Sequence, residues 1–454
     1  MTTQTEQPVD GSIFGESPNN WRIDRIRDHL GIIIGGDWGD DPDAHDEGVE
    51  IPVIRVADIR GLGVKTEGLT VRRIKESKLS GRLIGQRTVL LEKSGGGEQT
   101  PVGRAVLGRN LSFDAICSNF MAKTECGPTL DPLFVVYLLD AAYSRGINGA
   151  HIQQTTGIQN LRVFDYLNTH VAVPPLPEQK CIAAYLDASC AAIDAAVAAK
   201  RQQLETLDNL RNMTVHNAVT RGLNSNAKMK QAGLNWLSVV PAHWSLSRIR
   251  NVAKFSPAFS GKPPAFNEES TVVPMEFLNN DGSLDTTLKL PLEDITGGLT
   301  MFEAGDVLFA KITPCMENGK GAFVEKLPTR YAFGSTEFHV LRPNLSVDGR
   351  FLYFYTFNPI FRAYAAENMQ GAAGQKRVQS RFLKDTRLFL PPIAEQRSIS
   401  QFLVKKDNEF RTLFSQIEAQ ISKLTAYRMS LIHECVTGQR RVTDIDINRV
   451  KAHG

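Results

Sequence analysis

The stretch PPLPEQ, residues 174–179, leads into residues 180–221, which contain no proline or glycine before Gly222. Because these two residues most disfavour a helix interior, such a segment predicts one continuous helix. At about 1.5 Å of rise per residue, residues 179–221 span roughly 64 Å, more than the width of an ordinary compact domain. The sequence therefore predicts a helical spacer.

The same stretch occurs again 217 residues later. PPIAEQ, residues 391–396, repeats the hexapeptide, and residues 397–437 again lack proline and glycine before Gly438. Apolar residues in the second copy follow the alternating three-and-four spacing of a coiled-coil seam: Leu403, Phe410, Phe414, Ile417, Ile421, Leu424, Leu431 and Cys435. We expect the two helices to pair. Arg211 and Arg428 occupy equivalent seam positions, and either fix an antiparallel register or belong to a docking surface.

A second repeated motif divides the chain into two halves. The pattern W-x-x-x-R-I-R begins at Trp21 and again at Trp244, and each tryptophan is predicted to anchor a core. Each half then shows short β-like runs and a short helix, which predicts an irregular α+β domain before each long helix. The expected strands are residues 51–56, 87–91, 103–107, 306–311, 321–324 and 338–341, and the expected short helices are residues 132–144 and 349–368.

Bulk composition narrows the class of protein. With 454 residues, 42% of them hydrophobic, the chain can form two to four domains. No uninterrupted apolar run approaches 18 residues and the first residues lack a signal-peptide pattern, so we expect a cytoplasmic protein without a membrane span. The six cysteines form no C-x-x-C pair, which argues against zinc or disulfides.

Charge is unevenly distributed along the first half. Residues 51–123 carry 13 Lys and Arg against 6 Asp and Glu, whereas residues 37–50 hold seven acids and no Lys or Arg. Such segregation is what a phosphate-contacting surface requires, although a solvated surface is the alternative. The acidic loop is expected to be solvated; accepting a hydrogen bond from cytosine or repelling misplaced backbone is the less favoured interpretation.

Two glycine-rich loops follow predicted strands. One is EKSGGGEQTPVGR, residues 92–104, and the other is KITPCMENGKG, residues 311–321. Glycine allows close backbone approach, and Lys, Ser, Thr and Asn donate to phosphates or base edges. Neither loop has the spacing of a nucleotide-binding P-loop, and a plain hairpin turn is an equally good interpretation of each.

Catalytic motifs are missing from the sequence. There is no D-P-P-Y or N-P-P-F tetrapeptide for amino methyl transfer, no G-x-G-x-x-G after a strand, and no second histidine to complete a zinc site beside His433. We therefore expect no catalytic residues, no metal site and no cofactor in this chain.

These residues resemble the specificity subunits of type I restriction–modification enzymes. The resemblance rests on the duplicated PPLPEQ and PPIAEQ elements, the P-x-x-W motif before each globular domain, and the phrases GDVLFAKITPCMENGKGA and GSTEFHVLRP at residues 305–322 and 334–343. It implies target-recognition domains at residues 1–173 and 223–390, a central helix at residues 174–222, and a distal helix with a tail at residues 391–454. The implied fold class is α+β, a pseudo-twofold repeat with an antiparallel coiled coil.

The resemblance also implies a function and partners. Each globular domain would read one half of a bipartite double-stranded DNA target, and the helix length would set the unread spacer. Two modification subunits, which carry S-adenosylmethionine, would dock on the helical regions, and two restriction subunits using ATP and Mg would join them. Residues at the helix entrances are the expected docking elements: Pro174, Pro175, Glu178, Gln179, Pro391, Pro392, Glu395 and Gln396.

Candidate DNA contacts come from the loops and from GQKR, residues 374–377, ahead of the second helix. The first half has GIQN, residues 157–160, at the same place, so contacts by Gln159 and Asn160 follow less directly. The predicted DNA-binding residues are Lys93, Ser94, Gly95, Gly96, Arg104, Lys311, Thr313, Asn318, Lys320, Gln375, Lys376 and Arg377. Two other functions stay open: a coiled-coil scaffold without DNA specificity, and a stand-alone DNA nuclease.

Overall fold

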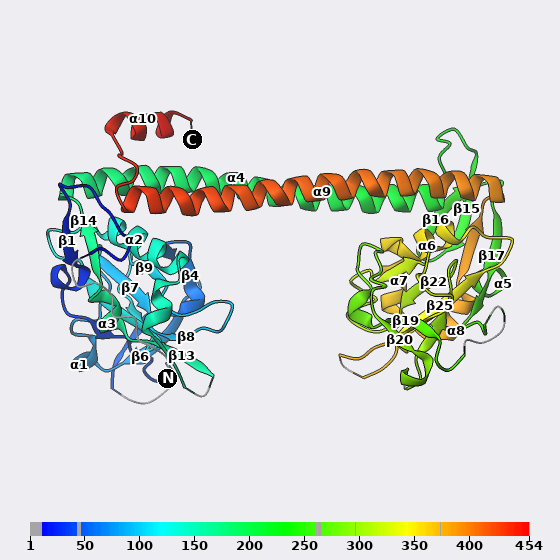
Figure 1. Cartoon of the computed structure of the whole chain (residues 1–454), viewed down its shortest axis with the longest axis horizontal. Coiled ribbons are helices and arrows are strands. Elements are labelled where there is room, and N and C mark those ends of the chain that lie inside the picture. Colours follow the sequence, from blue (N-terminus) through cyan, green and yellow to red (C-terminus); the bar gives the residue numbers. More distant parts are fainter. Residues whose placement is uncertain are drawn as a thin grey trace. The chain divides into compact units, whose positions relative to one another are not determined.

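The structure is a computed structural model that describes residues 11–42, 47–155, 157–259, 261, 265–295, 297–372 and 374–453. The chain folds into two compact units (Figure 1). Unit 1 comprises Met1–Lys200 and Ala419–Gly454, and unit 2 comprises Arg201–Glu418. Each unit contains one globular domain and part of each long helix, α4 (Leu176–Arg221) and α9 (Ile393–Val436).

Both long helices begin a few residues earlier than the absence of proline predicts. The hexapeptide itself supplies the first turn of each helix. Proline is tolerated in a first turn because the backbone N–H groups there have no acceptor within the helix, so losing one costs little. The carbonyl oxygen of Pro175 accepts from the backbone N–H of Gln179, and that of Pro392 accepts from Gln396, both at 3.0 Å. The hexapeptides therefore start the helices rather than precede them.

The globular part of unit 1 is built on a four-stranded sheet in the order β2-β11-β7-β9, in which β2 is Ile34–Gly35. It also contains two three-stranded sheets, β10-β3-β6 and β12-β13-β8, and the pairs β1-β14 and β4-β5. The short strands among these are β10 (Ile116–Cys117), β12 (Ile152–Thr155), β4 (Ile59–Arg60) and β5 (Gly63–Val64). The strands that position the site are β3 (Val49–Ile54), β7 (Thr88–Glu92), β8 (Ser94–Gly95), β9 (Ala105–Leu107), β11 (Met121–Glu125) and β13 (Ile158–Leu161). The three strands and the helix predicted for this half are all present.

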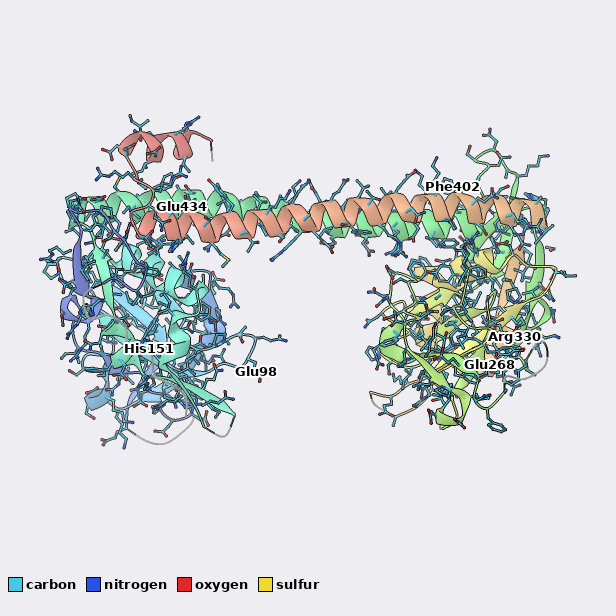
Figure 2. All side chains as sticks on the ribbon, viewed as in Figure 1. Glu98, His151, Glu268, Arg330, Phe402 and Glu434 are labelled. Carbon is cyan, nitrogen blue, oxygen red and sulfur yellow. The ribbon has the colours of Figure 1, made fainter. Side chains whose placement is uncertain are left out.

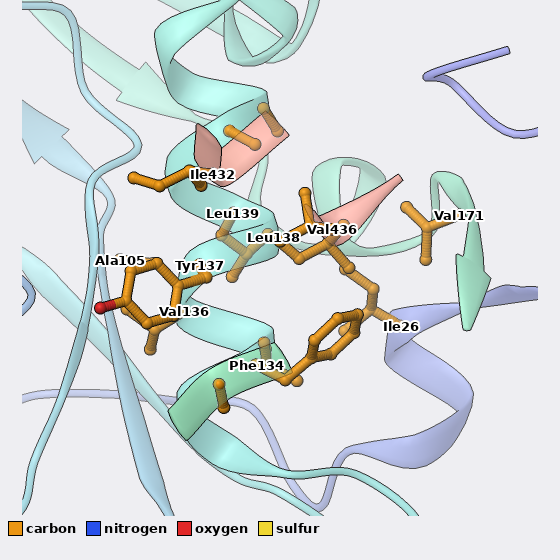
Figure 3. Close-up of a cluster of buried hydrophobic side chains, with 14 of the residues drawn as sticks. Ile26, Ala105, Phe134, Val136, Tyr137, Leu138, Leu139, Val171, Ile432 and Val436 are labelled. Atoms are coloured by element: carbon orange, nitrogen blue, oxygen red, sulfur yellow. The ribbon is translucent and has the colours of Figure 1, made fainter. Parts of the chain in front are cut away.

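The core of unit 1 joins the domain to the ends of both long helices. The buried face of α2 (Pro132–Ser144), with Phe134 and Leu138, packs with Leu186 of α4 and with Ile432 and Val436 of α9 (Figure 3). Burying apolar surface stabilises a fold by about 25 cal/mol per Å². Because this core includes side chains from the domain and from both helix ends, we expect these parts to fold together. In unit 1, the start of α4 therefore packs against the end of α9.

Unit 2 contains two four-stranded sheets, β18-β25-β22-β23 and β20-β19-β24-β21. Their short strands are β18 (Ala253–Phe255), β20 (Lys289–Pro291), β21 (Thr300–Phe302) and β24 (Ala332–Gly334). The strands that position the site are β19 (Glu269–Val273), β22 (Val307–Ala310), β23 (Gly321–Phe323) and β25 (Phe338–Pro343). Val215 and Val219 of α4 share its core with Ile399 and Leu403 of α9. In unit 2, the end of α4 thus packs against the start of α9.

One predicted helix is wrong in this half. Residues 349–368 form two helices, α6 (Gly349–Phe357) and α7 (Pro359–Glu367). Asn358 ends the first and caps the second, with its side-chain oxygen accepting from the N–H of Ile360 at 3.1 Å. Pro359 cannot donate within a helix and disfavours a helical residue before it, so the chain turns there.

Equivalent strands bring the start of each domain to its end. β1 (Arg22–Arg25) pairs with β14 (His170–Val173), and β17 (Ser245–Arg248) pairs with β26 (Arg387–Leu390), both antiparallel. Trp21 and Trp244 stand just before β1 and β17 and are 6% and 1% exposed, which confirms that each anchors a core. The two repeats found in the sequence therefore meet within each unit.

α4 is apolar enough over 18 residues to cross a membrane by length and composition. Part of that apolar character belongs to Leu186, Cys190 and Ile193, which are buried in the core of unit 1. The alanine-rich segment thus has a packing role inside the protein.

Candidate nucleic-acid interface

In the first domain, the glycine-rich loop and the GIQN segment lie side by side. The loop leaves β7, pairs through β8 with β13, and returns as β9, which is antiparallel to β7. Ser94 Oγ donates to Asn160 Oδ1 at 2.8 Å, and the side-chain oxygen of Gln159 accepts from the N–H of Val102 at 3.3 Å. The hairpin interpretation is thus correct, and a third strand is added to it. Figure 2 shows Glu98 at the outer end of this loop.

Gly96 is required by this arrangement. Its φ of +62° lies in the left-handed region, and a Cβ there would stand 2.9 Å from the backbone nitrogen of Val102 and 3.0 Å from Gln159 Oε1. A side chain would therefore displace the glutamine from the loop. Arg104, at the end of the loop, donates to the buried Glu92 carboxylate at 2.8 Å, so its charge is partly neutralised.

In the second domain, the structure brings together five of the seven predicted residues. The N–H of Val378 donates to the carbonyl of Lys311 at 2.8 Å, which sets GQKR beside the start of the loop. Thr313 Oγ1 accepts from the N–H of Lys376 at 3.1 Å. Gln375 and Lys376 are exposed, and Arg377 follows them, half-buried.

Asn318 and Lys320 lie apart from this group. Asn318 lines a cavity of about 820 Å³ whose wall includes Asp281 and, on α9, Arg411. Lys320 Nζ donates to the backbone carbonyl of Met275 at 2.8 Å. Of these two residues, Lys320 is engaged within unit 2, whereas Asn318 is exposed at the cavity.

The loop of the second domain is held by a residue that sequence reasoning missed. Arg362 is 6% exposed and donates to the carbonyls of Met316 at 2.7 Å, Lys320 at 3.2 Å and Thr356 at 3.0 Å. Burial lowers the pKa of its guanidinium to about 10, so it is still protonated at neutral pH. In the sequence, Arg362 lies three residues after Pro359 within a predicted helix, and nothing in the neighbouring residues indicates that it binds the loop.

Backbone hydrogen bonds define which residues of the two domains are equivalent. The carbonyl of Phe120 accepts from the N–H of Lys93, and that of Glu337 accepts from Lys311, both at 2.9 Å. Leu161 donates to the carbonyl of Lys93, as Val378 does to Lys311. Phe120 therefore corresponds to Glu337, and Asn160 to Arg377.

The chemistry at these equivalent positions differs. In the second domain Arg377 donates to the Glu337 carboxylate at 2.8 Å, and this hydrogen bond holds the pKa of Glu337 below its usual value. In the first domain Phe120 is 42% exposed and Asn160 is bonded to Ser94. One backbone frame thus presents a charged pair in one domain and an aromatic ring with an amide in the other.

The charge separation seen along the sequence is not a separation in space. Within the described part of residues 37–50, acids pair with the basic strand β6 (Thr70–Ile74) and with α1 (Glu76–Leu79): Asp41 with Arg72, Glu50 with Arg73, and Asp37 with Lys78. The expected solvated acidic loop and the expected basic surface therefore neutralise each other in part. Residues 43–46 of that loop lie outside the described residues.

At the helix entrances, each glutamine forms the same set of hydrogen bonds, which we call the glutamine clasp. Gln179 accepts from the N–H of Asp131 and donates to the carbonyls of Thr129 and Pro174. Gln396 accepts from Asp348 and donates to Ser346 and Pro391. Both glutamines are 1% exposed, so their side chains are occupied within the chain.

The other entrance residues divide into buried and accessible ones. Pro174 and Pro391 are buried, whereas Pro175 and Pro392 are exposed. Glu178 accepts from Asn20 at 3.4 Å, and Glu395 accepts from the indole N–H of Trp244 at 3.2 Å and contacts His243 at 2.8 Å. The exposed prolines and the half-buried glutamates are the entrance residues that a partner can reach.

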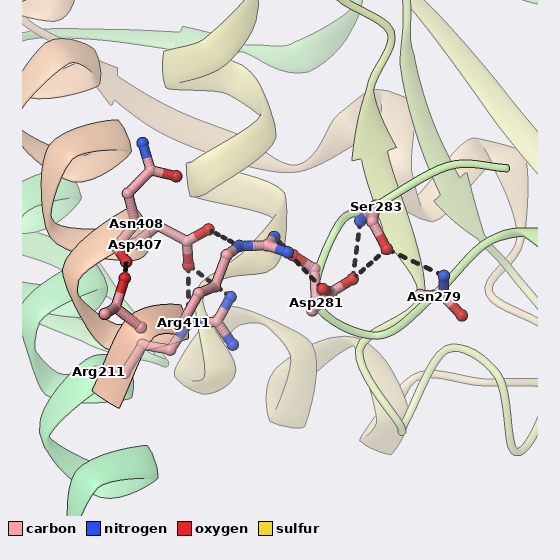
Figure 4. Close-up of polar contacts among 8 residues, drawn as sticks. Arg211, Asn279, Asp281, Ser283, Asp407, Asn408 and Arg411 are labelled. Atoms are coloured by element: carbon pink, nitrogen blue, oxygen red, sulfur yellow. Dashed lines mark hydrogen bonds and ion pairs between the residues drawn. The ribbon is translucent and has the colours of Figure 1, made fainter. Parts of the chain in front are cut away.

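Each seam arginine is paired with an acid on the other long helix. In unit 2 Arg211 contacts Asp407 at 2.7 Å, and Asp407 also binds Arg411, which reaches Asp281 (Figure 4). In unit 1 Arg428 contacts Asp194 at 3.2 Å and Asp140 at 3.5 Å. Of the two roles considered for these arginines, the contacts favour fixing the helix register.

Within the described ranges, no group of three or more His, Cys, Asp and Glu is arranged to hold a metal ion. All six cysteines are free thiols. Burial raises the pKa of Cys117, Cys126 and Cys435 to about 12, which keeps these three thiols protonated at neutral pH. The chemistry available in the loops is hydrogen bonding and charge.

Comparison with known proteins agrees with this arrangement. The family described as the type I restriction modification DNA specificity domain matches residues 241–423. The Escherichia coli type I restriction enzyme EcoAI specificity subunit is 31% identical over 193 residues. A putative type I restriction enzyme MjaX specificity subunit from Methanocaldococcus jannaschii is 21% identical over 433 residues, 94% of this chain and 96% of the relative. This chain is thus similar to type I restriction enzyme specificity subunits, most clearly over residues 241–423.

The matches to these specificity subunits differ in extent. The EcoAI match covers 42% of this chain but 32% of the relative, so the chain matches about a third of the length of that curated relative. Two solved structures share the fold at 15% identity. One, from a study of complex assembly and conformational transition of the type I R-M system, has a TM-score of 0.69 over 94% of this chain. The other, the HsdS subunit from Thermoanaerobacter tengcongensis, has a TM-score of 0.51 over the same share.

Proposed function

We propose that this chain is a specificity subunit, which selects the DNA sequence on which a type I restriction–modification complex acts. Each globular domain reads one half of a bipartite target, the first with Lys93, Ser94, Gly95 and Gly96 and the second with Lys311, Thr313, Gln375, Lys376 and Arg377. The observation that carries this proposal is the shared backbone frame, in which both loops meet the segment before the next long helix. Different side chains on one frame suit two different half-sites.

The domain boundaries follow from the proposal. Residues 1–173 and 223–390 form the two target-recognition domains, with the helices at residues 174–222 and 391–436 between and after them. The packing of opposite helix ends in each unit supports an antiparallel pair whose length sets the spacer between half-sites. The ion pairs of Arg211 and Arg428 support a fixed register.

The catalytic steps belong to partner subunits in this proposal. Two modification subunits, which bind S-adenosylmethionine, dock at the helix entrances through Pro175, Glu178, Pro392 and Glu395. Restriction subunits that use ATP and Mg join them, and the complex acts on DNA in the cytoplasm. Arg104 and Lys320 take supporting rather than reading roles, because their charges or donors are engaged within the domains. Asn318 is exposed but lies apart from the other loop residues, so it is left out of the reading set.

The experiment is to map methylated adenines in a host genome with and without this gene, and then with residues 1–173 replaced by the corresponding domain of another specificity subunit. We expect methylation at a bipartite sequence, of which the replacement changes one half only. Changes in both halves, or methylation independent of the gene, would contradict the proposal. Deleting one heptad from both helices in equivalent places should alter the spacer and leave both half-sites unchanged.

Two alternatives are distinguished by direct assays. A stand-alone nuclease would cleave DNA when the purified chain is incubated with a divalent metal and no partner. A scaffold without DNA specificity would assemble with the modification subunits yet bind all DNA sequences equally. We expect neither result.

A further inference from the structure

The first domain holds a pocket beside its reading loop. The pocket has a volume of about 370 Å³, and its lining includes Ser94, Gly95 and Gly96 of the loop. Trp38, Arg55 and Phe120 come from three other segments and complete the mouth and walls. A ligand bound here would therefore contact the same loop that the proposed function assigns to DNA.

The pocket contains an unpartnered hydroxyl. Ser118 is 3% exposed and lines the pocket, and its Oγ has no hydrogen-bond partner within the part of the chain that the structure describes. Buried hydroxyls are normally hydrogen-bonded, because burying one without a partner costs about 1–3 kcal/mol. Glu92, the acid beside it, is already paired with Arg104. The free hydroxyl can donate to an incoming carbonyl oxygen.

The rim of the pocket is aromatic and fixed in place. Phe120 is held by its carbonyl, which accepts from the N–H groups of both Lys93 and Ser94, while its ring is 42% exposed. Arg55 is held by Asp58, which accepts from its Nε at 3.1 Å and its backbone N–H at 2.9 Å. An exposed phenylalanine on a rigid backbone is suited to contact with an apolar group on DNA.

The corresponding position in the second domain is polar. There the residue equivalent to Phe120 is Glu337, which pairs with Arg377. The pocket chemistry is thus specific to the first domain, and it is not a general feature of the shared frame.

We propose that this pocket is a thymine-reading subsite. The 5-methyl group of a thymine contacts the ring of Phe120, and its O4 accepts a hydrogen bond from Ser118. Thymine is the base that offers a methyl group next to a carbonyl acceptor, and phenylalanine is a residue that contacts that methyl. This inference rests on the proposed function, since it requires the first domain to read DNA.

The test uses the chain assembled with its modification subunits and duplexes carrying the mapped target. Each thymine in the half-site read by residues 1–173 is replaced in turn by deoxyuridine, which removes only the methyl group. At one position we expect Kd to rise about three- to fivefold, which is the change in affinity expected when one buried methyl group is lost. Phe120→Ala should weaken binding and reduce the thymine-to-deoxyuridine ratio at that position to about one.

Two variants separate the subsite from general effects. Ser118→Ala should weaken binding to both duplexes while leaving the ratio intact, because thymine and deoxyuridine share O4. Phe164→Ala, which removes another exposed phenylalanine of the same domain, should retain the full ratio. Thermal unfolding of each variant checks that the domain is folded.

The outcomes distinguish this inference from the function beneath it. Sequence-specific binding that is insensitive to deoxyuridine at every position, or a ratio that survives Phe120→Ala, would overturn the thymine subsite and leave the proposed function standing. Binding without any sequence preference would overturn both.

Discussion

The two globular domains share a backbone frame and differ in how that frame is stabilised. In both, a glycine-rich loop follows a central strand and pairs with the segment before the next helix. In the first domain the amide side chains of Gln159 and Asn160 hold the loop, and the Arg104–Glu92 ion pair joins its two ends. In the second domain the loop is fixed by the buried cation of Arg362 and by the Glu337–Arg377 pair. The difference shows that loop position and loop chemistry can vary separately.

The largest expected effect concerns Arg362. Arg362→Met removes a charged donor from three carbonyl groups, of which those of Met316 and Lys320 each keep one backbone donor, so we expect the free energy of unfolding of unit 2 to fall by about 3 kcal/mol. Chemical denaturation, with hydrogen exchange of residues 316–320 to locate the change, measures it. Arg145, 217 residues earlier, is exposed at the end of α2, and Arg145→Met should change stability by less than about 0.5 kcal/mol. Equal effects of the two changes would remove this contrast.

A smaller effect is expected from Asp58, which belongs to the first domain alone. Burial raises the pKa of this carboxyl, but hydrogen bonds from Arg55 and Lys65 outweigh that effect and bring the pKa down to about 2. Because the folded pKa is below the unfolded one of about 3.9, the stabilisation is complete at neutral pH and is lost as pH falls from about 4 through 2. At neutral pH it amounts to about 2 kcal/mol.

Asp58→Asn should therefore lower the stability of unit 1 at pH 7 and flatten its dependence on pH between about 4 and 2. Urea denaturation followed at several pH values gives both quantities. If the variant kept the wild-type slope in that range, the carboxyl would not be the group responsible.

The two anchoring tryptophans offer a matched pair. Trp244 donates its indole N–H to Glu395, whereas the indole nitrogen of Trp21 has no hydrogen-bond partner among the described residues. Trp244→Phe should therefore cost about 1–2 kcal/mol more than Trp21→Phe, since it also removes one of the two side chains that contact the half-buried Glu395 carboxylate. Thermal unfolding of the two single variants compares them, and a reversed order would contradict the assignment.

The smallest effect on stability is expected at the charged pair of the second domain. Glu337→Gln should change the free energy of unfolding by less than about 1 kcal/mol, because the pair is partly solvated. Freed from its counter-charge, Arg377 should steepen the plot of log K for DNA against log salt concentration by about one unit. Glu325→Gln, which frees Arg350 on α6 instead, should leave the slope unchanged.

Much of the fold follows from local pattern. The long helices, the strands around each loop and the tryptophan anchors were predictable because periodicity, proline and glycine act over a few residues. The structure corrects that prediction at Pro359, where one expected helix is two, and at the hexapeptides, whose last four residues form the first turn of each long helix.

The site was predictable only in outline. The loops could be found from glycine and lysine, but Trp38, Arg55 and Phe120 lie far apart in sequence and meet only when the sheets form. Glu337 and Arg377 are 40 residues apart in sequence, and the ion pair between them likewise forms only when the second domain folds. Ion pairs also cancel the charge contrast between residues 37–50 and residues 51–123, because composition counts charges without their partners.

The glutamine clasp bears on how such a protein can evolve. Every group that Gln179 and Gln396 bind on their domains is a main-chain amide or carbonyl, and none is a side chain. The join between helix and domain therefore places no demand on which amino acids the domain contains at those points. The globular domain can therefore be exchanged for another, or change greatly in sequence, while the helix keeps the same three hydrogen bonds to main-chain groups.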